Sequence, residues 1–338
     1  MNSIKRGAIT LAAGALALAM TLGVARAQDK IYTMKISLAT INDQIHAFAK
    51  NFAAALEKES GGRIKPEIYP ASQLGPIPRQ AEGVQFGAIQ CQLVPPEFLV
   101  GIDERFEVMA APGLVGSMAH GQRLVADPEV LKLMLGLGAD KGMHGVGLFM
   151  VNPSAIASKV PIRHLVDFKG KKIRIFASPF QSTAFDRLGA TPVAMTLGDV
   201  LPALQQGAID GAVASTAVFT AFHYQDAAKY ATETGQPAIF AIVEISKKWY
   251  DALPADLQQL IDRTAARETV AINPQATEIT ENSRKIWTDT GGELISLPAD
   301  EQTALLKLLK SVGADVSKEK PLLNAAYQIV SAAAERTK

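Results

Sequence analysis

The stretch KGKKIRIFASPFQSTAFDRLGATPVAMTLGDVLPALQQGAIDG, Lys169–Gly211, is the part of the chain that decides the fold. Near its start Arg174 alternates with Ile173 and Ile175, a pattern typical of a half-buried strand, and Pro179 marks the end of that strand. A guanidinium on such a strand needs an anionic partner, because desolvating its charge alone is costly. No acidic residue lies within the strand. The partner is either a carboxylate from outside the protein or a distant Asp or Glu, and the residues alone leave both open.

The rest of this stretch continues the alternation of helix and strand. Leu197–Asp199 leads into a helix with Val200 and Leu204 on its buried side, and Ala208–Ala214 is again strand-like. This β/α alternation predicts an α/β fold with ligand at the carboxyl ends of strands or between lobes. Further predicted elements are strands at Met34–Leu38, Ile64–Ile68 and Ile89–Val94, and helices from Ile45 to Gly61, at 79–86, at Asp256–Thr290, at Ala299–Ser311 and at Pro321–Arg336. Pro274 should kink the long helical pattern or divide it in two.

The N-terminus predicts export. Lys5 and Arg6 precede an apolar stretch from Ala8 to Val24, and Ala25-Arg26-Ala27 has the small-x-small pattern of a cleavage site. We therefore predict that residues 1–27 are a cleaved signal peptide. A retained membrane anchor is the alternative interpretation.

Composition excludes several classes of protein. The 34 basic residues include Lys5, Arg6 and Arg26, so the chain after residue 27 has 31 basic and 33 acidic side chains, a net charge of −2. Nucleic-acid-binding proteins usually carry a basic face, so we expect no nucleic-acid partner. Cys91 is the single cysteine, which excludes an internal disulfide and a thiolate metal cluster. An exported chain of this length without a disulfide needs a sizeable core, and two lobes are expected.

No catalytic signature is present in the sequence. The chain has no Gly-x-Ser-x-Gly nucleophile elbow, no His-Glu-x-x-His motif and no phosphate-binding loop. Its five histidines are scattered without the spacing of metal ligands. Asp103, Glu104 and Glu107 form an acidic cluster that we expect on a solvated loop. We therefore predict that the protein is not an enzyme and has no cofactor or metal site.

Four ordered blocks carry a resemblance to a known family. They are Ser60–Ile64 with Tyr69-Pro70 and Gln73–Gly75, then LVDFKGKKIRIFASP at Leu165–Pro179, LGATPVAMTLGDVLPALQQGAIDG at Leu188–Gly211, and KWYDALP at Lys248–Pro254. From near Met34 to near Asp262 the chain resembles the solute-binding proteins of tripartite ATP-independent periplasmic (TRAP) transporters, of the DctP type. Four blocks in the family's order are far more specific than any single motif.

The resemblance implies a fold, a location and partners. The fold is a two-lobed periplasmic-binding-protein fold with hinge strands and a long C-terminal helix that spans the lobes. We expect residues 28–150 and 241–338 to form lobe I and residues 151–240 to form lobe II, with hinges near Met150–Asn152 and Phe240–Glu244. Such a receptor works as a monomer in the periplasm, closes on a small organic acid and delivers it to TRAP membrane permease subunits. A sensor subunit that presents the ligand to a signalling partner is an alternative use of the same fold.

The resemblance also implies the anchor of the site. Arg174 falls on the position of the family's carboxylate-binding arginine, and a rigid guanidinium fork can bind a carboxylate through two parallel hydrogen bonds. Many members have a second arginine shortly before the turn at Ser158–Ile162, and here the matching position is Pro153, beside Asn152. After the Asp-Gly pair, the family's Gln-Glu-Asn-Pro, or Ala-Glu-Trp in metal-assisted keto-acid binders, is replaced by Ala212–Ser215.

These departures predict an apolar pocket with one anchor for an anion. The candidate ligand-binding residues are Arg174, Phe176, Asn152, Thr40, Pro95, Ser215, Phe219 and Phe240. Each phenylalanine is alternatively an ordinary core residue. A second buried carboxylate would have no partner there, so we favour an aromatic or otherwise hydrophobic monocarboxylate as ligand. A four-carbon dicarboxylate or a keto acid is the alternative.

Overall fold

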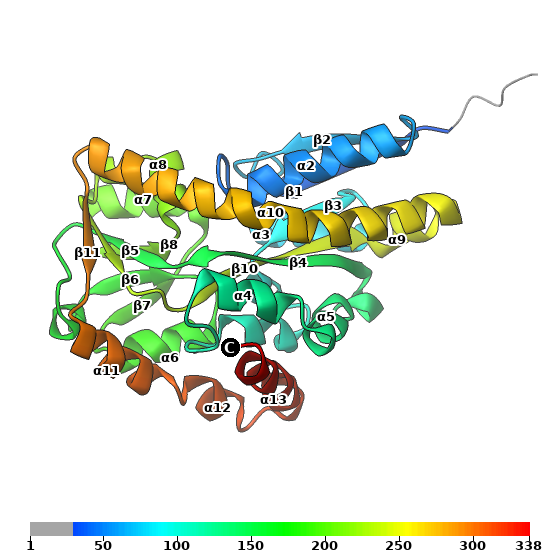
Figure 1. The fold of residues 1–338 in the computed structure, drawn as a ribbon. Coiled ribbons are helices and arrows are strands. Elements are labelled where there is room, and N and C mark those ends of the chain that lie inside the picture. Colours follow the sequence, from blue (N-terminus) through cyan, green and yellow to red (C-terminus); the bar gives the residue numbers. More distant parts are fainter. Residues whose placement is uncertain (1–29) are drawn as a thin grey trace, which may run out of the picture.

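The structure, a computed structural model, describes residues 30–338 (Figure 1). Its strands form two sheets, one of five strands in the order β2-β1-β3-β10-β4 and one of six in the order β11-β9-β5-β8-β6-β7. The two sheets, each with its helices, lie side by side. The predicted two-lobed α/β fold is confirmed. The predicted signal peptide, residues 1–27, lies outside the described residues.

In the first sheet the long strand β10 runs antiparallel to the other four strands. β1 (Tyr32–Leu38) lies between β2 (Ile64–Tyr69) and β3 (Cys91–Val94), and β10 (Ala238–Ser246) pairs antiparallel with both β3 and β4 (Met143–Pro153). The segments that cover this sheet or connect its strands are α2 (Gln44–Glu59), α3 (Ile77–Phe86), α4 (Met118–Val125), α5 (Pro128–Leu135), α9 (Lys247–Asp251) and the short 3₁₀ turns η1 (Pro96–Leu99), η2 (Glu104–Ala110) and η3 (Ala139–Lys141).

Both faces of the first sheet are buried. Successive residues of a strand face opposite sides, so β4 sends Met150 into one hydrophobic core and Phe149 into another. In the second of these cores Phe149 stacks on Phe48 of α2, with the ring centres 4.7 Å apart. Because both sides are covered, the interior strand β10 is buried along its whole length and is a nearly continuous apolar run.

The second sheet carries the stretch that decides the fold. β6 (Lys172–Ile175) runs parallel to its two neighbours, β7 (Thr191–Ala194) and β8 (Gly211–Ala214). β5 (Ala155–Ser158) pairs antiparallel with β8 and with β9 (Tyr230–Glu233). The helices and turns that follow these strands or connect them are α6 (Pro179–Arg187), α7 (Leu197–Gln206), α8 (Thr216–Ala221), η4 (Leu165–Phe168) and η5 (Tyr224–Asp226).

Two short connections join the sheets. One is Ser154, between β4 and β5, and the other is residues 234–237, between β9 and β10. The hinges were expected slightly earlier, within β4, and slightly later, at Phe240–Glu244, but Phe240–Glu244 lies inside β10 and pairs with β4. The lobe boundaries stay a prediction. One part of 241–338 differs from them, because β11 (Glu293–Ser296) pairs with β9 in the second sheet.

The long helix α10 (Ala255–Asp289) spans both lobes. It packs against α2 and β4 on one side and against α8 and β11 on the other, as Figure 1 shows. Pro274 was expected to kink or divide this helix, and the helix is not divided. Proline leaves the carbonyl of Val270 without its helical partner, but Val270 is largely exposed and that carbonyl can hydrogen-bond to water.

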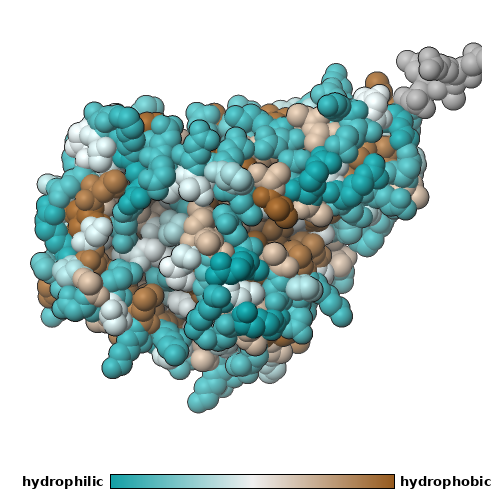
Figure 2. Space-filling model, viewed as in Figure 1, coloured by the Kyte–Doolittle hydropathy of each residue, from teal (hydrophilic) through white to brown (hydrophobic). Residues whose placement is uncertain are grey.

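The chain ends in three helices below the sheets. α11 (Ala299–Leu309) and α13 (Pro321–Arg336) agree with the predicted ranges, and α12 (Val312–Ser317) was not predicted. α12 packs on α6 of the second lobe, whereas α13 packs on α5 and η2 of the first. Among residues 30–338 no helix is both long and apolar enough to cross a membrane. The face in Figure 2 is mostly hydrophilic, with its apolar atoms in small separate patches.

We predict that Gly211→Ala destabilises the fold while Gly198→Ala does not. A Cβ at Gly211 would lie 2.8 Å from the carbonyl oxygen of Ala157 on the paired strand, whereas a Cβ at Gly198 on α7 meets nothing within 4 Å. The first substitution should lower the free energy of unfolding by about 1–3 kcal/mol. The second should leave it unchanged or raise it by up to about 1 kcal/mol, because alanine favours the helix. Urea denaturation of both variants checks this, and equal stability of the two would contradict it.

Candidate ligand-binding site

The carboxyl ends of parallel strands from both sheets meet around one cavity, which we call the ligand cavity. The first sheet contributes Ala39 and Thr40 after β1 and Pro95 after β3, and the second contributes Phe176 after β6 and Ser215 after β8. Ligands of open α/β sheets bind outside the carboxyl ends of strands. The cavity has a volume of about 50 Å³, which is room for a few water molecules or a small ligand.

A wider groove leads to the ligand cavity. It has a volume of about 390 Å³ and lies between residues 72–77 of the first lobe and residues 196–199 of the second. Ala39, Ile77 and Leu197 line both the groove and the cavity. The ligand cavity therefore opens between the two lobes rather than through either one.

Arg174 is the one cationic residue that lines the ligand cavity in the described part of the chain. Its side chain is 1% exposed. Nε donates to the carbonyl oxygen of Met195 and Nη1 to that of Val213, each at 3.0 Å. A guanidinium has five N–H donors, so three remain without a protein partner among residues 30–338. Its hydrogen bonds within residues 30–338 go to backbone carbonyls and not to a carboxylate, so the structural ion pair that was the alternative is not formed. The binding of an external carboxylate by Arg174 stays a prediction.

Arg174 stays positively charged although its side chain is buried. Desolvation lowers the pKa of Arg174 to about 10, so the guanidinium is still cationic at neutral pH. Its Cζ lies 4.9 Å from the ring centre of Phe176, an arrangement that favours a cation over the ring face. Phe176 in turn stacks on Phe98 with ring centres 5.2 Å apart. The cavity thus joins one buried cation to an aromatic wall.

Two carboxyl groups of the first lobe are buried against the residues that follow β6, and one of them, Glu97, interacts electrostatically with Arg174. Glu107 was expected on a solvated loop but is buried in η2, where it accepts hydrogen bonds of 2.7 Å from Ser178 Oγ and from the Phe180 N–H. Glu97 in η1 is 2% exposed and lies 3.5 Å from Nε2 of Gln181. Burial raises the pKa of Glu97 to about 8 and the pKa of Glu107 to about 7. These contacts tie the first lobe to the turn after Arg174's strand.

The structure brings five of the eight predicted site residues together. Arg174, Phe176, Thr40, Pro95 and Ser215 all line the ligand cavity, and their roles in binding stay predictions. The other three lie elsewhere. Strand alternation decides two of them, because Val151 and Ile239 face the cavity while their neighbours Asn152 and Phe240 do not. Phe219 packs in the core against Tyr224 and Trp287, with ring centres 5.7 Å away in each case.

Sequence reasoning missed several residues of the cavity. They are Ala39, Asp43, Ile45, Ile77, Leu93, Val151, Leu197, Ala214, Val218 and Ile239. Most are apolar and lie in a strand or in a helix that follows one, which is a signal the sequence offers only once these elements are placed. Asp43 is the acidic one: it caps α2 by accepting from the His46 N–H at 2.9 Å, and burial raises its pKa.

Comparison with protein families identifies the class. Residues 37–320 match the family model DctP, described as bacterial extracellular solute-binding protein, family 7. The chain belongs to this family of solute-binding receptors. A curated relative, the C4-dicarboxylate-binding periplasmic protein DctP of Rhodobacter capsulatus, is 27% identical over 304 residues, which are 88% of this chain and 90% of the relative.

Solved structures show the same fold. A TRAP periplasmic solute-binding protein from Desulfovibrio salexigens matches with a TM-score of 0.86 and 21% identity, over 91% of this chain and 100% of that one. Another from Shewanella oneidensis matches with a TM-score of 0.83 and 21% identity, over 90% and 99% of the two chains. The resemblance to TRAP solute-binding proteins inferred from the four sequence blocks is confirmed.

We predict that Glu97→Gln removes a loss of stability that the parent protein shows between about pH 4.5 and pH 8. The pKa of Glu97 is about 8 in the folded protein against an ordinary value of 4.5 for a glutamate, so the unfolded state ionises first and stability falls as pH rises from 4.5 through 8. The stability of the glutamine variant lacks this dependence on pH, because glutamine does not ionise. It should match the parent near pH 4.5 and exceed it at pH 8 by roughly 3–5 kcal/mol.

Urea denaturation at the two pH values measures this difference. Glu104→Gln is the matched control, because Glu104 is in the neighbouring turn and pairs only with Lys320 at 3.9 Å on the surface. A stability gain that is equal at both pH values would contradict the prediction.

Proposed function

We propose that this protein is the receptor of a TRAP transporter, which binds a small organic acid between its two lobes and delivers it to the membrane permease. The observation that carries the proposal is Arg174, buried at the junction of the lobes with three N–H donors that no described residue accepts. A carboxylate accepts two of these in parallel and supplies the missing charge. Monomeric action in the periplasm stays part of this proposal.

The ligand that fits best is a monocarboxylate with a hydrophobic or aromatic body. Besides Arg174, the polar side chains around the ligand cavity are Thr40, Asp43 and Ser215, and the rest of the wall is apolar. A second carboxylate would meet no cation there and would lie near Asp43 and Glu97. Aromatic rings beside Phe98 and Phe176 would gain about 1 kcal/mol each beyond their buried area.

Relatives support both this class and its alternative. The Desulfovibrio salexigens protein holds orotic acid, a planar heterocyclic monocarboxylic acid, whereas the Shewanella oneidensis protein holds succinate. Other solved relatives hold sugar acids such as β-D-galacturonate. A four-carbon dicarboxylate or a keto acid is therefore the second candidate class, and a sensor subunit is an alternative role for the same binding event.

We predict that Arg174→Ala weakens carboxylate binding by roughly 2–5 kcal/mol, at least about thirtyfold. Arg174→Lys should also bind poorly, because an ammonium group cannot reproduce the planar fork. Isothermal titration measures both variants, with a thermal melt to show that each is folded. Arg163→Ala is the control: Arg163 is an exposed arginine of the same lobe, paired with Glu293 on the surface. Unchanged affinity in both Arg174 variants would mean that this arginine is structural.

A thermal-shift screen separates the ligand classes. We expect benzoate, cinnamate and orotate to raise the melting temperature, and succinate and malate to have little effect. A ligand at about 100 times its dissociation constant stabilises by about 2.7 kcal/mol, which is readily detected. A shift with succinate or malate and none with the aromatic acids would overturn the preference for a hydrophobic monocarboxylate while leaving the receptor assignment intact.

A further inference from the structure

A second cavity, with a volume of about 340 Å³, lies on the other face of the strands that line the ligand cavity. Val151 lines the ligand cavity and Asn152 lines the second; Ser215 lines the first and Thr216 the second. Neighbours along a strand point to opposite sides. The two cavities share no lining residue, so the second is not an extension of the first.

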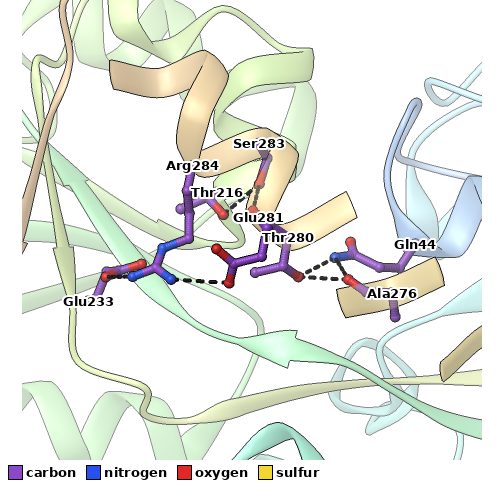
Figure 3. Close-up of polar contacts among 8 residues, drawn as sticks. All are labelled: Gln44, Thr216, Glu233, Ala276, Thr280, Glu281, Ser283 and Arg284. Atoms are coloured by element: carbon purple, nitrogen blue, oxygen red, sulfur yellow. Dashed lines mark hydrogen bonds and ion pairs between the residues drawn. The ribbon is translucent and has the colours of Figure 1, made fainter. Parts of the chain in front are cut away.

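Three segments form most of the wall of this second cavity, and each of them connects or spans the two lobes. They are the β4–β5 connection (Asn152–Ala155), the β9–β10 connection (Glu233–Gly235) and the face of α10 that carries Thr277, Thr280, Glu281 and Arg284. Figure 3 shows Arg284 and Glu281 on α10 with Glu233 opposite. Met118 and Gln302 complete the lining.

Buried polar atoms in this cavity lack partners. Asn152 is 1% exposed and Ser154 is 2% exposed, yet neither Asn152 Oδ1 nor Ser154 Oγ has a hydrogen-bond partner among the described residues. The same is true of Arg284 Nε. A buried polar group without a partner costs about 1–3 kcal/mol, and native proteins rarely leave such groups unsatisfied. These two oxygens and one N–H are therefore the atoms with which a polar occupant of the cavity can form hydrogen bonds.

The charges of the cavity define the chemistry of that occupant. Arg284 is held by Glu233, at 2.6 Å, and by Glu281, at 3.2 Å. Two carboxylates and one guanidinium leave a net charge of −1, which favours a cationic group near the acceptors Asn152 Oδ1 and Ser154 Oγ. The remaining N–H of Arg284 Nε requires an acceptor. Residues 30–338 contain no group of three His, Cys, Asp or Glu that would hold a metal ion.

We propose that the second cavity binds a small zwitterion of the α-amino-acid class. Its ammonium group donates to Asn152 Oδ1 and Ser154 Oγ within the field of the two glutamates, and its carboxylate accepts from Arg284 Nε. Because the occupant touches both connections and α10, it stabilises one relative setting of the lobes. Any effect on affinity at the ligand cavity is then reciprocal, since coupling between two sites acts equally in both directions.

Methionine methyl NMR of the chain from residue 28 onward tests this site directly. Met118 lines the second cavity, whereas the backbone carbonyl of Met195 accepts from Arg174. With methyl-¹³C methionine, glycine and L-serine should shift the Met118 signal in a saturable way and leave Met195 in place. Glycine betaine is the matched probe, because its quaternary ammonium has no N–H to donate and should bind at least about tenfold more weakly.

Two variants and one control complete the experiment. Ser154→Ala and Asn152→Leu should each weaken the Met118 response to glycine by about tenfold. Thr264→Val removes another buried hydroxyl without a partner, on α10 but outside the cavity, and should change nothing. No shift of Met118 at roughly tenfold above a millimolar dissociation constant would overturn the proposal. So would an equal response to betaine, or a response that survives in both variants.

Discussion

The burial of Arg174 is the constraint on which the rest of the site depends. Two backbone carbonyls, not a carboxylate, hold its guanidinium, so the protein positions the charge without neutralising it. Both carbonyls belong to neighbouring strands of the second sheet or to the residue that follows one, and the register of β6, β7 and β8 therefore sets the direction of the fork. A desolvated cation in this condition is tolerable because the ring of Phe176 lies beside it and the two carbonyl dipoles point at it.

The two lobes contribute chemically different groups to the ligand cavity. The second lobe supplies the cation, and the first supplies Asp43 together with most of the apolar wall. The hydrogen bonds from Ser178 and Phe180 to Glu107 join the lobes directly under the site. The acidic side chain that lines the ligand cavity, Asp43, thus belongs to the lobe that does not hold the arginine. On the opposite face the links between the lobes enclose a polar space of the opposite sign.

Elements with local sequence signals could be predicted from the sequence, whereas elements that form only through long-range pairing could not. The helix Pro321–Arg336 was predicted to the residue, because a proline at its first position and an apolar periodicity are both local signals. β11 was missed, since four residues become a strand only by pairing with β9, some sixty residues earlier. The same distinction between local and long-range signals applies to the residues of the candidate site. Arg174 and Phe176 were predicted from a dense sequence block, whereas Asn152 and Phe240 were placed wrongly because one residue of strand alternation decides which face a side chain takes.

The closure of the ligand cavity has a kinetic consequence. Arg174 is almost wholly inaccessible, and the small ligand cavity beside it opens into the groove between the lobes, so a bound acid that leaves by this route has to pass between them. Its residence time is then set by how often the lobes separate rather than by the strength of the contact with the guanidinium. A membrane partner that binds both lobes and separates them can therefore speed the release of the ligand many-fold without contacting the ligand itself.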